Sequence, residues 1–64
     1  MTGKYKSEFE NISELLEEAA SRLLQLAGEV DSERPRAGSY LYGAEGSVQH
    51  AMDQLDEAEA ENNL

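Results

Sequence analysis

Two groups of acidic residues have the spacing in this 64-residue chain that is best suited to chemistry. Within each group the carboxylates are one, three or four positions apart, and residues three or four apart lie on one side of a helix. Carboxylate oxygens are the ligands that Mg²⁺ prefers in proteins. The groups are Glu14, Glu17 and Glu18, followed later by Asp53, Asp56 and Glu57.

A repeat of apolar residues must position these acids. Successive apolar residues are separated alternately by four and three positions, which is the heptad repeat of a coiled coil, with positions named a to g. We assign its a and d positions to the seam between two helices. In the first segment these residues are Tyr5, Phe9, Ile12, Leu16, Ala19, Leu23, Leu26 and Val30. In the second they are Ala37, Leu41, Ala44, Val48, Ala51, Leu55 and Ala58.

The pattern predicts an all-α fold, an antiparallel helical hairpin that forms a single domain over residues 1–64. We expect helix 1 over about residues 5–31, a loop over 32–38 and helix 2 over about 39–61. Pro35 should end the first helix, because proline disfavours the helical conformation in the preceding residue. Ser39 is the natural N-cap of the second helix. Glycines at 43 and 46 leave Ser47 open as a later start.

A lone hairpin of this size should be only marginally stable. The second seam alternates alanine with larger residues, and so short a chain gains only ~3–5 kcal/mol from its own core. Cysteine is absent, so a disulfide cannot help. Small residues at the e positions of helix 1 (Ser13, Ala20 and Ala27) widen its apolar stripe, as in a bundle. We therefore predict a homodimer that forms a four-helix bundle.

The two acidic groups resemble the paired motifs of all-α nucleoside-triphosphate pyrophosphatases, in which carboxylates from two helices bind magnesium. The heptad assignment argues against that activity here. It places both groups at b, c and f positions, which point away from the hairpin interior and cannot converge on one ion. We therefore predict a protein that is not an enzyme, with no catalytic residues, no metal site and no cofactor.

Net charge limits the partners. Fourteen acidic residues against five basic ones give −9, which disfavours direct contact with nucleic acid or an anionic membrane and favours a basic protein partner. No apolar run approaches the length of a membrane span, and the first residues lack the apolar stretch of a signal peptide. We expect a soluble, cytoplasmic protein.

Two function classes follow. The first is a protein interaction module, such as a small regulator, inhibitor or assembly adaptor. Its candidate binding residues are the outlying apolar, tyrosine and arginine side chains Leu24, Arg34, Arg36, Tyr40, Tyr42 and Met52. The alternative is a nucleic-acid mimic that blocks a basic DNA- or RNA-binding protein. Its candidate phosphate-mimicking acids are Glu10, Glu14, Glu17, Asp53, Asp56 and Glu57.

Overall fold

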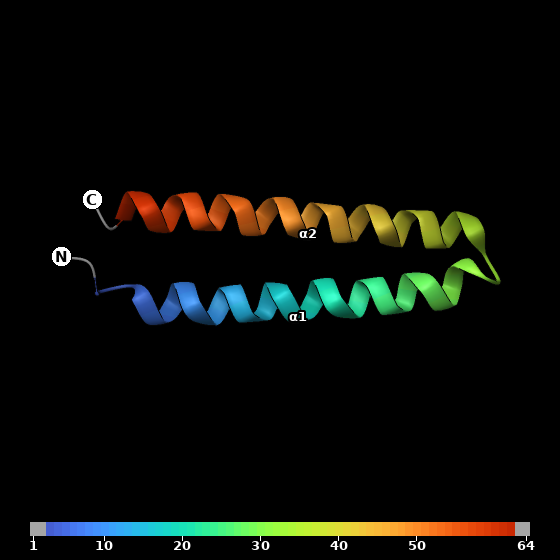
Figure 1. Cartoon of the computed structure of the whole chain (residues 1–64), viewed down its shortest axis with the longest axis horizontal. Coiled ribbons are helices and arrows are strands. Elements are labelled where there is room, and N and C mark those ends of the chain that lie inside the picture. The colour runs from blue at the N-terminus through green and yellow to red at the C-terminus, as the bar shows by residue number, and fades with distance from the viewer. Residues whose placement is uncertain (1–2, 63–64) are drawn as a thin grey trace.

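The protein is a hairpin of two long helices. The computed structural model describes residues 3–62, so the outermost residues of the predicted 1–64 domain lie outside the described part. Helix α1 (Lys6–Asp31) is followed by helix α2 (Pro35–Asn62), and the two run antiparallel, so that the start of α1 and the end of α2 lie at the same end of the hairpin (Figure 1). The predicted all-α hairpin is confirmed.

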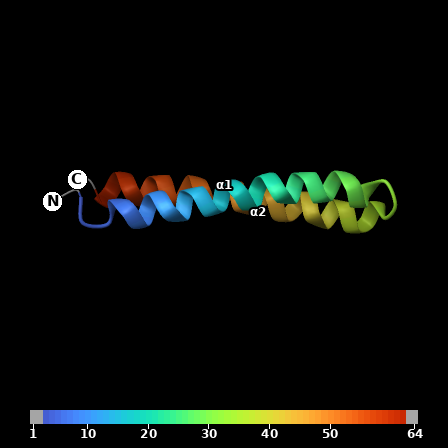
Figure 2. The ribbon, with the colours of Figure 1, turned by 90° about the horizontal axis from the view of Figure 1, so that it is seen from below.

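The hairpin is one layer thick. Its Cα atoms extend over 50 × 15 × 9 Å, and the two helices cross at a shallow angle when seen from the side (Figure 2). The radius of gyration is 14.9 Å, whereas a compact domain of this length has about 10.7 Å. Both broad faces of the hairpin are therefore open.

The bounds of α1 agree with the sequence prediction. The amide of Phe9 donates to the carbonyl of Tyr5 at 3.0 Å, and Tyr5 is the N-cap without a side-chain hydrogen bond. Ser7, which has the capping-box spacing to Glu10, lies inside the helix instead. The alternating apolar residues thus set the helix more strongly than its capping residues do.

The start of α2 corrects the prediction. The second helix begins at Pro35 rather than at Ser39 or Ser47, and the connection is only residues 32–34. The amide of Gly38 donates to the carbonyl of Arg34 at 3.0 Å, which places proline at the first helical position. Proline is favoured there because its missing N–H would have no partner and its φ is already helical. The Oγ of Ser47 donates to the Gly43 carbonyl at 3.2 Å from within the helix.

The helices approach closely next to the loop. Gly38 is buried, and a Cβ built on it would lie 2.7 Å from the Cα of Asp31. Ala20 and Ala27, on the face of α1 that meets α2, are 5% and 0% exposed. They are the buried hydrophobic side chains among the residues that the structure describes. The buried part of the hairpin is therefore made of small residues between two close backbones.

The seam consists of a and e positions, and this differs from the predicted a and d. The buried residues Ala20, Ala27 and Gly38 all fall at e, whereas Ile12 and Leu26 at d are 40% and 47% exposed. Small e residues let the backbones come together, so the helices turn these residues toward each other. That rotation moves the d positions out of the seam.

Candidate interaction surfaces

The d positions of both helices lie on one broad face of the hairpin. On each helix, d lies about 80° to one side of the direction midway between a and e. Helix α2 is related to α1 by a half-turn about an axis perpendicular to the plane of the hairpin, since it runs antiparallel and its seam points back toward α1. A half-turn about that axis keeps each broad face on its own side, so the d positions of α2 lie on the same broad face as those of α1. We call this surface the d face. It comprises Tyr5, Ile12, Ala19, Leu26, Ala37, Ala44, Ala51 and Ala58.

The d face is apolar and largely uncovered. Tyr5 is 48% exposed, comparable to the values for Ile12 and Leu26, and Leu15 at the neighbouring g position is 64% exposed. The side chains of Tyr5, Phe9 and Ile12, with Glu8, line a shallow depression near the open end of α1. The large side chains come from α1 and its N-cap residue Tyr5, while α2 contributes only alanine at its d positions.

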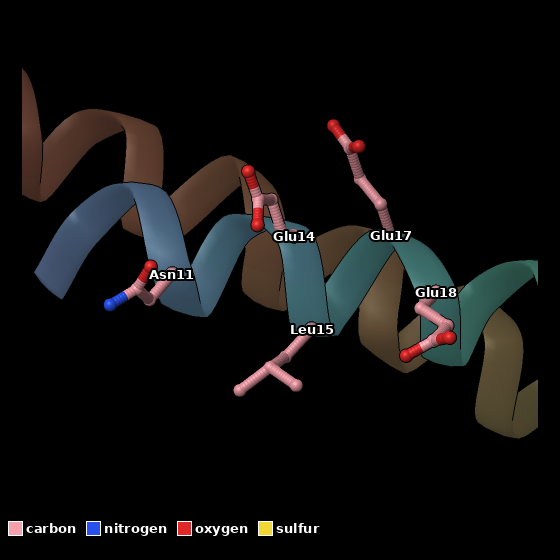
Figure 3. Close-up of a pocket in the computed structure, with 5 residues that line it drawn as sticks. All are labelled: Asn11, Glu14, Leu15, Glu17 and Glu18. Atoms are coloured by element: carbon pink, nitrogen blue, oxygen red, sulfur yellow. The ribbon is translucent and has the colours of Figure 1, made fainter. Parts of the chain in front are cut away.

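Acidic residues occupy the other side of α1. Figure 3 shows Glu14 and Glu17 projecting on one side of the helix and Leu15 on the opposite side. These three residues, with Asn11 and Glu18, line a second shallow depression on the outer surface of α1. The broad face opposite the d face carries the b positions, and we call it the b face. Its described residues include Glu10, Glu17, Leu24, Tyr42, Gln49 and Asp56.

The loop end is the basic part of this acidic chain. Arg34, Pro35, Arg36, Ala37 and Tyr40 together line a shallow depression there, which we call the tip. Tyr40 is 75% exposed. Among the residues that the structure describes, neither arginine forms an ion pair with a carboxylate. The structure thus brings together three of the predicted partner-binding residues: Arg34, Arg36 and Tyr40.

The other three predicted partner-binding residues lie elsewhere. Tyr42 is two positions beyond Tyr40, so it projects from the b face, where Leu24 also lies. Both are about half-exposed, at 45% and 46%. Met52 is partly buried at an e position of the seam. Leu24 and Tyr42 therefore lie on the b face, separate from the tip.

The six predicted phosphate-mimicking acids are all exposed. They lie at b, c and f positions of two helices, so they spread over the b face and the outer edges rather than along one row. The ion pair in the described residues joins Arg22 Nη2 and Glu18 Oε1 at 3.2 Å, one helical turn apart. Both side chains are well exposed, and such a pair contributes little to stability.

Within residues 3–62, no three histidine or acidic side chains are arranged to hold a metal ion. In that same part of the chain, neither helix has an apolar stretch long enough to cross a membrane.

Comparison with known proteins gives no family to which the chain can be assigned. No family model, no curated protein and no solved structure matches it. Its surfaces are therefore the basis for inferring what it does.

Four exposed large apolar residues were not among the predicted binding residues: Tyr5, Ile12, Leu15 and Leu26. The heptad pattern assigned Ile12 and Leu26 to the seam of the hairpin. The signal that could have placed them outside is the set of small residues at the e positions, since two helices in close contact need small residues between them.

Proposed function

We propose that this chain is a non-enzymatic protein interaction module that acts as a homodimer, as a small regulator, inhibitor or assembly adaptor does. The observation that carries the proposal is the imbalance between the core and the surface. The buried hydrophobic residues of the described part are two alanines, while large apolar side chains stand 40% to 64% exposed on α1. Contiguous exposed apolar surface of this kind marks a site of protein association.

The tip is the surface that we assign to a different protein. Tyrosine and arginine are the residue types that contribute most often to binding energy at interfaces. Tyr40 is three-quarters exposed, and two arginines lie beside it without carboxylate partners in the described part of the chain. The guanidinium groups are therefore available to acceptors on a partner, while the net charge of −9 favours a partner whose surface is otherwise basic.

A nucleic-acid mimic is the second candidate function, supported by the exposure of all six predicted acids. A row of glutamates one helical turn apart has a spacing of ~6 Å, whereas one DNA strand has a phosphate every ~3.4 Å. Several rows on two helices, and on two chains in a dimer, would be needed to approach the charge density of DNA.

Affinity capture with matched variants separates these functions. The wild-type chain is immobilised beside a tip variant (Arg36→Ser with Tyr40→Ser) and an acid variant (Glu14→Gln with Glu17→Gln). A lysate of the source organism is applied at low and at high salt. We expect the tip variant to capture at least about tenfold less of a specific partner protein than the wild-type chain does, because hot-spot residues contribute ~2 kcal/mol or more to binding. The acid variant should retain it, and salt should have little effect.

Loss of capture in the acid variant, together with elution of a nucleic-acid-binding protein by salt, would support the mimic instead. Equal capture by all three chains, or no specific capture, would contradict the assignment of the tip as a binding surface.

A further inference from the structure

The whole hairpin exposes more surface than a compact monomer of its mass, by about the area that one partner buries in a dimer interface. The hairpin has an accessible surface of 4978 Å², while a folded monomer of 7.1 kDa has about 4,100 Å². The excess is therefore about 900 Å². A standard stable interface buries about 800 Å² on each partner. One further copy of the hairpin has the right size to cover this excess.

We propose that a second copy of the chain covers the d face, with α1 of each copy packed on α2 of the other and both loops at the same end of the bundle. This arrangement rests on the homodimer of the proposed function and goes beyond it, because it specifies the face, the neighbours and the orientation. The evidence is the distribution of large and small residues on the d face.

Large residues on α1 lie level with small residues on α2. Asp31 and Gly38 are in close contact across the hairpin, and each helix rises ~1.5 Å per residue away from that point. Counting outward in equal steps places the d residues of α1 within about one residue of d residues on α2. The level pairs are Leu26 with Ala44, Ala19 with Ala51 and Ile12 with Ala58.

A two-fold axis can relate two such faces in two ways. If the axis runs along the helices, every residue stays at its own level, and α1 faces the partner's α2. Leu26 and Ile12 then pack against alanines, so large and small residues alternate across the interface. If the axis runs across the helices, α1 faces the partner's α1 and α2 faces the partner's α2. Leu26 then meets Ile12 on one side while alanines meet alanines on the other.

The first arrangement fills the space between the hairpins more evenly. Helix pairs with large residues on both sides stand further apart than pairs with alanine on both sides, and a rigid hairpin cannot satisfy both distances without leaving voids. Protein interiors tolerate few voids of that kind. The axis along the helices gives two kinds of contact between a large residue and an alanine, Leu26 with Ala44 and Ile12 with Ala58, and each occurs twice by symmetry.

Charge is compatible with this interface. None of the d positions is acidic or basic. Glu8, Glu29 and Glu61 lie at g positions beside the d face, and most of the other acids lie at b, c and f positions on the opposite face and the outer edges. There, physiological salt screens their repulsion over ~8 Å. With both loops at one end, the dimer also places Arg34, Arg36 and Tyr40 of both copies at that end, so the tip is present twice and can bind a bivalent partner.

Single cysteines test the arrangement without interference, because the chain has none of its own. Ala19→Cys and Ala51→Cys are made separately, and Gln25→Cys at an outer c position serves as the control for random collision. Each variant is first oxidised alone. Ala19→Cys and Ala51→Cys are also mixed in equal amounts under reducing conditions, so that subunits exchange, and the mixture is then oxidised. A disulfide needs Cα atoms within ~7 Å, so only direct neighbours join. We expect a cross-linked dimer in about half of the protein from the Ala19→Cys and Ala51→Cys mixture, because random exchange places half of the chains in mixed dimers. We expect little cross-linking from either variant alone.

The possible failures are distinguishable when sedimentation equilibrium accompanies the oxidation. Cross-linking of Ala19→Cys with itself and of Ala51→Cys with itself would overturn the arrangement while leaving the homodimer in place. A dimeric mass with no cross-linking above the Gln25→Cys control would exclude the d face as the interface. A monomeric mass for the wild-type chain would overturn both this inference and the homodimer of the proposed function.

Discussion

Leu24 and Leu26 lie two positions apart on the same helix and face opposite sides of the hairpin. Their exposures are nearly equal, at 46% and 47%, so burial within one chain does not distinguish them. The residues that surround them on each face do distinguish them. Leu26 shares the d face with Ile12 and Tyr5, whereas Leu24 shares the b face with Glu10 and Glu17. We therefore assign the proposed contact with a second hairpin to the d face, none of whose d positions is charged, rather than to the b face with its acids.

The largest effect is expected from a charge placed between the helices. Leu23→Asp introduces a carboxylate at an a position of the seam, next to the e positions that hold the buried alanines. An unpaired charge there costs several kcal/mol, which is as much as the whole core of so small a chain supplies. Far-ultraviolet circular dichroism should show loss of the helical signal. A folded, helical Leu23→Asp would mean that the a positions do not form the seam.

Gly38→Ala tests how close the helices are beside the loop. Its new Cβ would lie 2.7 Å from backbone and side-chain atoms of Asp31, so the helices must shift apart. We expect a loss of ~1–3 kcal/mol in the free energy of unfolding, the usual cost of inserting atoms into a packed site. Urea titration measures this loss. An unchanged or higher midpoint would show that the backbones are further apart there.

Gly43→Ala and Gly46→Ala should act in the opposite direction. Both glycines lie inside α2, and a Cβ on either would meet no atom within 4 Å. Replacing glycine by alanine at such helical positions should add ~0.5–1 kcal/mol each to the free energy of unfolding. The same titration compares them with Gly38→Ala. Destabilisation would instead indicate that another backbone packs against this outer edge, which would place an interface away from the d face.

The smallest effect is expected on the acidic side. Glu14→Ala and Glu17→Ala remove exposed side chains that form no ion pair in the described part of the chain. The free energy of unfolding should stay within about 0.5 kcal/mol of the wild-type value. Thermal melts of both variants should therefore overlay the wild-type melt at equal concentration. A loss comparable to that of Gly38→Ala would place these glutamates in a contact between chains.

The heptad repeat was sufficient to predict two antiparallel helices and the bounds of the first. The predicted start of the second helix was wrong. Proline ends a preceding helix but is also favoured as the first residue of a following one, and the sequence alone did not show that Pro35 has the second role. As a result, the predicted loop ended at Gly38, whereas the loop in the structure ends at Arg34, four residues earlier.

The surfaces were predictable only in part. Arg34, Arg36 and Tyr40 are close in sequence and come together at the loop. Tyr42 was grouped with Tyr40 by proximity in the chain, but a step of two residues turns a helix by ~200° and puts it on another face. The choice between a/d and a/e seams depended on how closely the backbones approach. That distance follows from Ala20, Ala27 and Gly38 acting together, rather than from the apolar repeat.

Sedimentation equilibrium of Leu26→Asp and Leu24→Asp tests most directly whether the d face joins two copies. The variants place the same charge on the same helix at equally exposed positions, so they differ only in the face that receives it. We predict that Leu24→Asp keeps about twice the 7.1 kDa chain mass at micromolar concentration, while Leu26→Asp falls to the mass of one chain. A dimeric Leu26→Asp, or a Leu24→Asp that alone becomes monomeric, would contradict the d face as the interface.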